Sequence, residues 1–430
     1  MHPAGNVVAG SEAEQPYLVV STDSHAGPSL ERQLRQYCPQ RYLAEFDDFV
    51  TSVRHGATDE ASALIQRRKE QFTRSGLAED ALRRARECPG LQDPDARRRD
   101  MDADGIAADV IFAGGLNNEP LPFIGFGADA GPAAVSPELR GVGARIWNAW
   151  LADFVSVDPW RHVGVMQIPI YDVGLAVSEV EWGKTAGLGA VNLPAPRSDF
   201  PSYTDPIYEP LWSACEELDL PMVTHGGAGE PPVGIDAPAG DLLFSAENHL
   251  LSRRGLWHLI LGGVFERHAG LRFVLCEQRS HWVPETLRDL DSIWVSRARD
   301  YSPPILPRLP SEYWHDHCYV GASFMARFEF ETRDEVGLDN LLWGTDYPHP
   351  EGTWPHTELA LRRTFSEAPV DAVRRVLGQN AVDVFGLDEQ KLRAVADQIG
   401  PTPRTVSAPL PDSELPDYLG QAFRTVGAYA

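Results

Sequence analysis

Short runs rich in Val, Ile and Phe alternate along the chain with longer amphipathic segments, which is the pattern of repeated strand–helix units. Most of the runs are continuously apolar, as in parallel strands that are buried on both faces. The segment that begins at Ser136 predicts a helix, because an N-cap residue is followed by Pro137 at the first helical position. We predict eight strands, at residues 17–23, 107–114, 162–169, 189–195, 221–226, 271–277, 318–324 and 340–346.

Eight such units predict an α/β fold of the closed (β/α)₈ TIM barrel type, which needs about 250 residues. A doubly wound open sheet is the rival, but no GxGxxG motif follows the first strand. We expect one barrel domain over residues 1–430, with a helical insertion after strand 1 at residues 28–100 and a Pro-rich, extended C-terminal arm at residues 398–430. The insertion is either a cap beside the barrel mouth or a solvated surface segment.

The composition narrows the classes of partner. The chain has 62 Asp and Glu against 38 Lys and Arg, a net charge of −24. This acidic balance argues against nucleic acid and against an anionic membrane surface as partners. Because no apolar run reaches about 18 residues and the N-terminal residues lack a signal-peptide pattern, we expect a cytoplasmic protein that does not span a membrane.

Histidines and carboxylates, which commonly bind metal ions, follow several predicted strands. They lie at the end of the barrel where TIM-barrel enzymes place their catalytic residues. Taken singly, each has a structural explanation, such as a core histidine, a helix N-cap or an ion pair. Taken together, they favour a divalent metal bound by His and carboxylate ligands. The candidates are Asp23 and His25 after strand 1, His225 after strand 5, Glu277 and His281 after strand 6, and Asp346 and His349 after strand 8.

The DxH motif at 23–25, the THGG motif at 224–227 and the segment GTDYPHPEGTWP at 344–355 resemble the amidohydrolase-related family that includes aminocarboxymuconate-semialdehyde decarboxylase. The resemblance runs from about residue 17 to residue 390. It implies a metal-binding TIM barrel whose members hydrolyse C–N bonds, decarboxylate or hydrate. It also implies a set of metal ligands, namely Asp23, His25, His225 and Asp346. The resemblance to this family, together with the C-terminal arm, leads us to expect a homodimer.

The chain departs from the family pattern in two places. Glu277 stands where the decarboxylases carry a histidine after strand six, which argues against decarboxylation. The three lysines of the chain, Lys69, Lys184 and Lys391, all lie outside the predicted fourth strand, so a carbamylated lysine that bridges two metals is excluded.

These departures favour a non-haem diiron monooxygenase that uses O₂ to hydroxylate a small metabolite of secondary metabolism. The strand-six pattern is similar to a group of such enzymes that includes one from the platensimycin and platencin pathway. In this hypothesis six side chains hold the two irons, namely Asp23, His25, His225, Glu277, His281 and Asp346.

The alternative is a mononuclear zinc or manganese hydrolase or decarboxylase that acts on a small carboxylate or amide. In it, Asp346 acts as general base, and His281 or His349 acts as general acid. A third possibility is a non-catalytic barrel that serves in binding or assembly.

Overall fold

Eight parallel strands form the centre of the structure, and each one pairs with the next along the chain. The computed structural model describes residues 14–55, 79–125, 135–227, 239–301 and 305–415. Nearly every strand residue is buried, which explains why the sequence shows continuous apolar runs instead of alternation. The strands are β1 (Val20–Ala26), β2 (Ala108–Ala113), β3 (His162–Met166), β4 (Ala190–Asn192), β5 (Met222–His225), β6 (Phe273–Cys276), β7 (Cys318–Ser323) and β8 (Leu341–Gly344).

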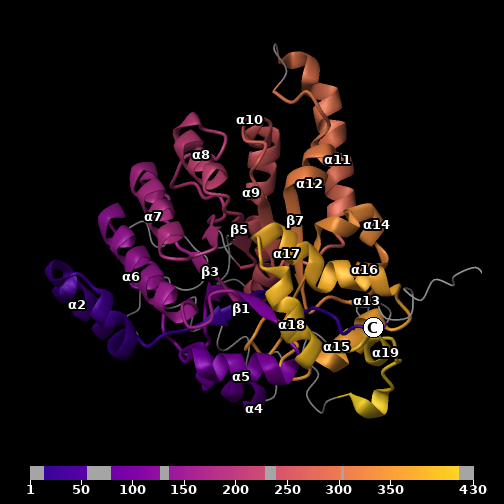
Figure 1. The fold of residues 1–430 in the computed structure, drawn as a ribbon. Helices are drawn as coiled ribbons and strands as arrows, with labels where there is room; N and C mark the ends of the chain where they lie inside the picture. Colours follow the sequence, from indigo (N-terminus) through magenta and orange to yellow (C-terminus); the bar gives the residue numbers. More distant parts are fainter. Residues whose placement is uncertain (1–13, 56–78, 126–134, 228–238, 302–304, 416–430) are drawn as a thin grey trace, which may run out of the picture.

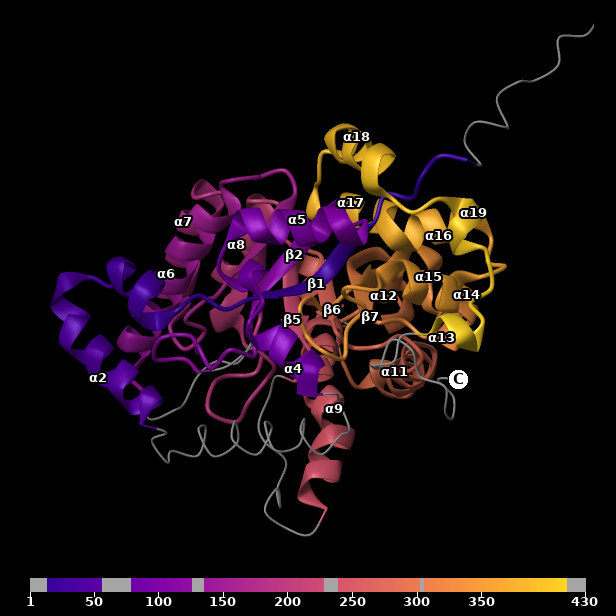
Figure 2. The same ribbon diagram turned by 90° about the horizontal axis from the view of Figure 1, so that it is seen from below.

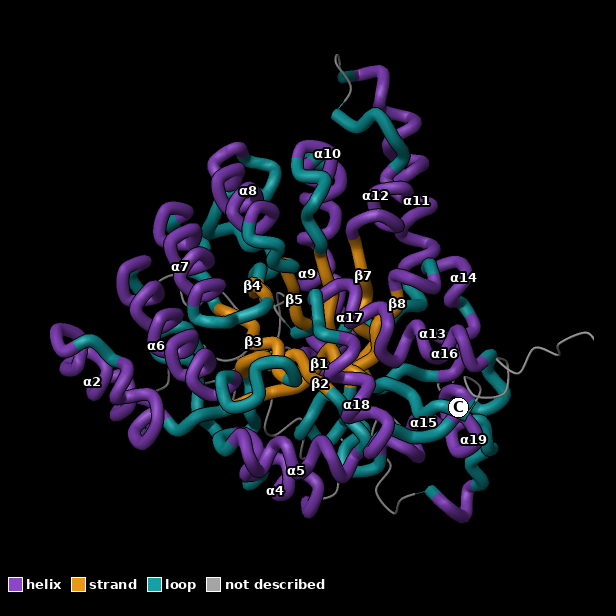
Figure 3. The backbone as a smooth tube through the Cα atoms, in the orientation of Figure 1, coloured by secondary structure: helices purple, strands orange, loops and turns teal. Residues whose placement is uncertain are grey.

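The sheet closes on itself where β1 meets the segment that follows β8. Ser24 and Tyr347 form a parallel bridge between them. The His25 N–H donates to the Tyr347 carbonyl at 2.6 Å, and the Asp346 N–H donates to the Asp23 carbonyl at 3.0 Å. The strands therefore lie together at the centre with the helices outside them (Figure 3), and the predicted (β/α)₈ barrel is confirmed.

The helices follow one another around the strands in chain order (Figure 1), and α9 extends beyond the body of the barrel (Figure 2). Among the described residues, no helix combines the length and the apolar character that a membrane crossing requires. The helices are α2 (Leu43–Arg54), α4 (Glu79–Arg86), α5 (Pro94–Asp104), α6 (Pro137–Val155), α7 (Val173–Thr185), α8 (Glu209–Glu217), α9 (Gly240–Leu261), α10 (Val264–Arg267), α11 (Val283–Arg297), α12 (Pro310–His317), α13 (Arg327–Glu331), α14 (Arg333–Val336), α15 (Thr357–Phe365), α16 (Val370–Arg374), α17 (Asn380–Phe385), α18 (Glu389–Ile399) and α19 (Pro403–Val406).

The first strand lies further along the chain than the apolar run at 17–23 predicts. Its pairing with β2 continues to Ala26 and contains an irregularity between Ser21 and Ser24. Asp23 and His25 consequently lie within β1 and not beyond its end. An irregularity of this kind redirects side chains and is common beside active sites.

The insertion after β1 is helical, as predicted, where the structure describes it. Phe46 and Val50 of α2 are buried, and the Phe46 ring lies 6.4 Å from that of Phe123. This part of the insertion packs on the barrel and is not a solvated appendage. Residues 56–78 lie outside the described residues, and the role of the insertion as a cap stays a prediction.

The C-terminal segment differs from the predicted extended arm. Residues 400–415 include the short helix α19, and Leu410 is buried in a small apolar cluster. The Arg362 guanidinium of α15 holds Glu414 at 2.7 Å. Apolar contact and this ion pair therefore fold the segment back onto its own barrel, although its proline content predicts extension. Residues 416–430 lie outside the described residues.

Candidate metal centre

Four of the predicted metal ligands come together in space from three strands. Asp23 and His25 lie on β1, His225 ends β5, and Asp346 follows β8 by two residues. Asp23 and Asp346 are fully buried, whereas His25 and His225 are 2% and 8% exposed. The barrel thus gathers residues from opposite ends of the sequence into one buried group, which we call the ligand group.

The distances within the ligand group are short. His225 Nε2 lies 3.2 Å from Asp23 Oδ1, and His25 Nε2 lies 3.5 Å from the same oxygen. His25 Nε2 also lies 3.1 Å from Asp346 Oδ1. Ligand atoms that share one metal ion at about 2.1 Å stand roughly 3–4 Å apart. The separations therefore fit a divalent ion shared by Asp23, His25 and His225, and Asp346 adjoins that ion position through its contact with His25.

Three further side chains border the ligand group. His349 Nδ1 lies 3.0 Å from Asp346 Oδ1, and its ring stacks on His25 with 4.0 Å between the ring centroids. Glu277 Oε2 lies 3.5 Å from His225 Nδ1. Glu351 completes a triad with Glu277 and Asp346, whose ligand atoms all lie within 4.8 Å of one another. Sequence reasoning missed Glu351 as a site residue, although its i+2 spacing from His349 is the signal that points to it.

The structure does not bring His281 into these groups. Its side chain is 39% exposed, and its Nδ1 lies 3.8 Å from Glu329 Oε1. The reason is local: β6 ends at Cys276, the chain turns away after Glu277, and His281 lies two residues before the start of α11. Spacing from the strand end alone placed it near the metal.

The geometry of the ligand group fits a cation better than internal hydrogen bonds. His25 Nε2, both carboxylate oxygens of Asp346 and Glu351 Oε2 are buried without a hydrogen-bond partner among the described residues. Buried polar atoms in this state are costly unless a ligand satisfies them. Imidazole nitrogens and carboxylate oxygens are both ligand atoms that zinc and manganese bind.

In the metal-free protein, the buried histidines differ widely in pKa. Burial and the neighbouring His349 lower the pKa of His25 to about 4. Burial would also lower the pKa of His225, but the Asp23 and Glu277 carboxylates outweigh it and raise that pKa to about 9. Asp346 in the same way raises the pKa of His349 to about 10. The metal-free site therefore holds protons where a cation would otherwise balance the carboxylates.

The backbone at two of these positions is unusual. Glu277 has φ +52° and Asp346 has φ +56°, in the left-handed region that residues other than glycine rarely adopt. Such conformations persist where the surrounding structure enforces them, and they concentrate at functional sites. The strain directs both carboxylates to the same end of the barrel.

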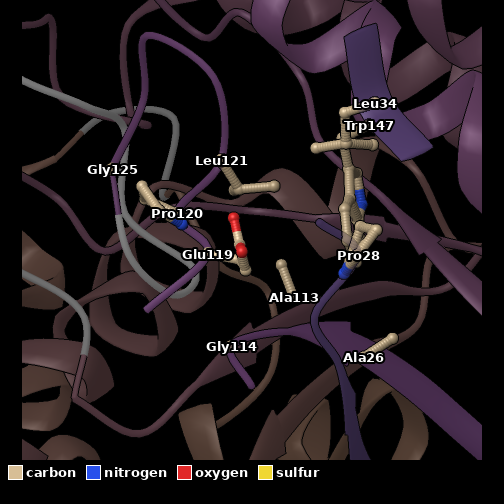
Figure 4. Close-up of a pocket in the computed structure, with 10 residues that line it drawn as sticks. All are labelled: Ala26, Pro28, Leu34, Ala113, Gly114, Glu119, Pro120, Leu121, Gly125 and Trp147. Carbon is tan, nitrogen blue, oxygen red and sulfur yellow. The ribbon is translucent and has the colours of Figure 1, made fainter. Parts of the chain in front are cut away.

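A small hollow adjoins the ligand group on the β1–β2 side (Figure 4). Two of its lining residues also contact the site: the Ala113 carbonyl lies 3.2 Å from His25 Nδ1, and the Gly114 carbonyl lies 2.9 Å from His349 Nε2. Among the described residues that line the hollow, Glu119 is the one carboxylate, and it accepts a hydrogen bond from the Leu30 N–H at 3.0 Å. The hollow is lined by Ala26, Pro28, Leu34, Ala113, Gly114, Glu119, Pro120, Leu121, Gly125 and Trp147.

A (β/α)₈ barrel with histidines and carboxylates grouped at the C-terminal ends of its strands has the architecture of a metal-dependent enzyme. Comparison with known proteins gives the particular family. Residues 23–387 match the amidohydrolase family, so the chain belongs to that family.

Among curated proteins, the chain is similar to two gamma-resorcylate decarboxylases. The one from Polaromonas sp. strain JS666 is 26% identical over 224 residues, which cover 48% of this chain and 65% of that protein. The one from Rhodococcus jostii is 27% identical over 269 residues, which cover 57% and 77%. The chain thus spans just under two-thirds of the length of the Polaromonas relative.

Solved structures show the same fold. A 5-carboxyvanillate decarboxylase from Sphingomonas paucimobilis has a TM-score of 0.61 at 20% identity, over 86% of this chain and 99% of that chain. A variant of the Novosphingobium aromaticivorans enzyme, with bound manganese, has a TM-score of 0.66 at 19% identity, over 86% and 97%. These relatives agree with the decarboxylase alternative, and none of them supports the leading hypothesis of a diiron monooxygenase that uses O₂.

We expect the metal-free protein to lose stability as the pH rises from 6.5 to 9. His225 and His349 have folded pKa values of about 9 and about 10, above the ordinary 6.5, so the stability that they contribute is complete below pH 6.5 and is lost above it. Burial raises the pKa of Glu277 to about 8, which acts in the same direction. Thermal unfolding in EDTA across this range, compared with the same series in Mn²⁺, measures the effect. Because fewer protons compete at higher pH, stabilisation by Mn²⁺ should grow. A metal-free melting temperature that rises with pH would contradict the expectation.

The positions of two histidines give a second prediction. Removal of a residue that holds a metal ligand in place typically weakens metal binding by about 10–100-fold, and removal of a ligand should cost at least as much. We therefore expect His225→Ala to weaken Mn²⁺ binding by at least about tenfold. His281→Ala should leave the Kd unchanged, since that side chain lies outside the ligand group. Isothermal titration of both variants with Mn²⁺ makes the comparison. An equal loss in the two variants would show that His281 reaches the metal.

Proposed function

We propose that this protein is a decarboxylase that uses one divalent metal ion and acts on a small aromatic carboxylate. The observation that carries the proposal is the buried ligand group of Asp23, His25, His225 and Asp346, with its unpartnered nitrogen and oxygen atoms. The similarity to decarboxylases of gamma-resorcylate and 5-carboxyvanillate supports the reaction and the substrate class. Manganese in the Novosphingobium structure supports the choice of metal.

The four residues of the ligand group would hold the metal. When bound, the metal supplies a positive charge that attracts and orients an anionic substrate. Ser323 of β7 donates a hydrogen bond to Asp23 Oδ2, which fixes the orientation of that carboxylate. His349 lies against Asp346 and donates from Nε2 to the Gly114 carbonyl, so it holds Asp346 from the other side. Supporting contacts of this kind keep ligands in place.

Glu277 is the residue that we assign as proton donor. Without a bound ion, burial together with the Asp346 and Asp23 carboxylates raises the pKa of Glu277 to about 8, so in that state its carboxyl group holds a proton near neutral pH. Its side chain is 20% exposed, which leaves it more accessible than Asp23 or Asp346. Decarboxylation breaks the bond between the ring carbon and the carboxylate, releases CO₂ and leaves an electron pair on the ring. Glu277 would give its proton to that carbon and then regain one from water.

Release of CO₂ from 2,6-dihydroxybenzoate and from 5-carboxyvanillate tests the proposal. We expect activity with Mn²⁺ under anaerobic conditions, and loss of activity after metal removal. Glu277→Gln should lower kcat by about 10²–10⁴-fold, the usual contribution of a general acid. Glu285→Gln, an exposed position on α11, is the matched control and should be unaffected. Turnover that depends on O₂ instead of releasing CO₂ would contradict the proposal.

One observation favours a second candidate, a centre with two metal ions. Glu277, Asp346 and Glu351 form a triad of their own beside the ligand group and share Asp346 with it. Two iron ions there would correspond to the diiron monooxygenase.

Elemental analysis of protein prepared with iron, zinc and manganese available separates the candidates. We expect one manganese or zinc per chain, because the ligand group fits a single ion. Two irons per chain would favour the monooxygenase, and Glu351→Gln should then reduce the metal content to one. In a one-metal enzyme the same variant should leave the metal content at one.

A further inference from the structure

The strand that carries two of the proposed ligands is irregular at Asp23, directly before His25. Between Ser21 and Ser24, β1 has three residue steps where β2 has two, from Asp109 to Ile111. Such a bulge removes regular pairing and re-aims the side chains within it. Contacts other than the regular ladder must therefore fix the direction of Asp23, while His25 pairs regularly with Phe112 just beyond the bulge.

Arg97 of α5 supplies contacts at this point. It is fully buried, and its Nη1 donates to the His25 carbonyl at 2.8 Å. Its Nη2 donates to Ser24 Oγ at 2.6 Å, and its Nε donates to Asp109 Oδ2 at 2.7 Å. The rigid fork of the guanidinium thus joins α5, the bulged part of β1 and the start of β2.

Arg97 also reaches the other side of the barrel closure. Its guanidinium lies 4.9 Å from the centre of the Tyr347 ring. Tyr347 follows Asp346, and its carbonyl accepts the His25 N–H at 2.6 Å. The Tyr347 hydroxyl donates to Asp100 Oδ2 at 2.6 Å, which ties it to α5 as well. One side chain therefore contacts the segments that carry Asp23, His25 and Asp346.

A second buried arginine shows that this placement is specific. Arg161 is 4% exposed and donates to the Ala107 and Ile106 carbonyls at 2.8 and 2.9 Å. These carbonyls precede β2, at the opposite end of the barrel from the ligand group. Both arginines hold backbone carbonyls in the core, but only Arg97 holds the backbone of a proposed ligand.

We propose that Arg97 is a positioning residue for the metal centre, which acts by fixing the bulged part of β1 and the Tyr347 segment so that Asp23, His25 and Asp346 face one ion. The proposal rests on the one-metal site of the proposed function. It assigns to a residue of the insertion, 72 positions from His25 in sequence, a role in metal affinity.

The test is Mn²⁺ affinity of the full chain by isothermal titration, together with thermal unfolding and the electron paramagnetic resonance spectrum of bound Mn²⁺. Arg97→Gln should weaken Mn²⁺ binding by about 10–100-fold, the usual effect of removing a group that orients a ligand. Arg97→Lys should recover part of the affinity, because lysine keeps the charge but not the fork. Both variants should change the Mn²⁺ spectrum.

Two controls separate positioning from general stability. Arg161→Lys should lower the melting temperature and leave the Mn²⁺ Kd and spectrum unchanged. Ser24→Ala removes one Arg97 partner with a small change in volume, so it provides a folded variant if Arg97→Gln does not fold; it should weaken binding severalfold. Unchanged Mn²⁺ affinity in Arg97→Lys and Ser24→Ala would overturn the proposal. Failure of the unaltered protein to bind Mn²⁺ would instead overturn the one-metal site itself.

Discussion

The close grouping of buried carboxylates is the constraint on which the rest of the site depends. Asp23 and Asp346 are fully buried, Glu351 is 6% exposed, and Glu277 lies beside them. Carboxylates at this proximity cannot all stay ionised without compensating positive charge. The protein has two ways to supply it, by protonation of its histidines or by binding a cation. The same histidines can therefore either carry protons, in the metal-free site, or bind the cation.

The same constraint alters the interpretation of Glu277. A glutamate in place of the histidine that the resembling decarboxylases carry would ordinarily remove a proton donor. In this environment the reverse holds, because burial and neighbouring carboxylates raise its pKa to about 8. A carboxyl group with such a pKa carries a proton near neutrality, as a histidine does. The departure from the family pattern therefore does not by itself argue against the decarboxylation that we propose.

The barrel and the ligand group could be predicted from the sequence, because parallel strands buried on both faces leave continuous apolar runs and their ends mark the catalytic side. Asp23, His25, His225 and Asp346 follow from that rule. The bulge in β1 and the exclusion of His281 could not be predicted, since each depends on the direction of a short segment of backbone. Glu351, by contrast, stands two residues after His349, a spacing that points to it. Leu410 likewise folds the C-terminal segment back through packing that its prolines conceal.

Closure of the barrel joins an early part of the chain to a part that is synthesised much later. The hydrogen bonds between Asp23 and Asp346, and between His25 and Tyr347, link residues that lie more than 320 positions apart. Contacts at such separation form late in folding, because a long loop must first be closed. A growing chain on the ribosome therefore has the first two proposed ligands long before it has the last one. Under the proposed ligand set, competence to bind the metal arises only after the eighth strand is in place, so it would report completion of the whole barrel.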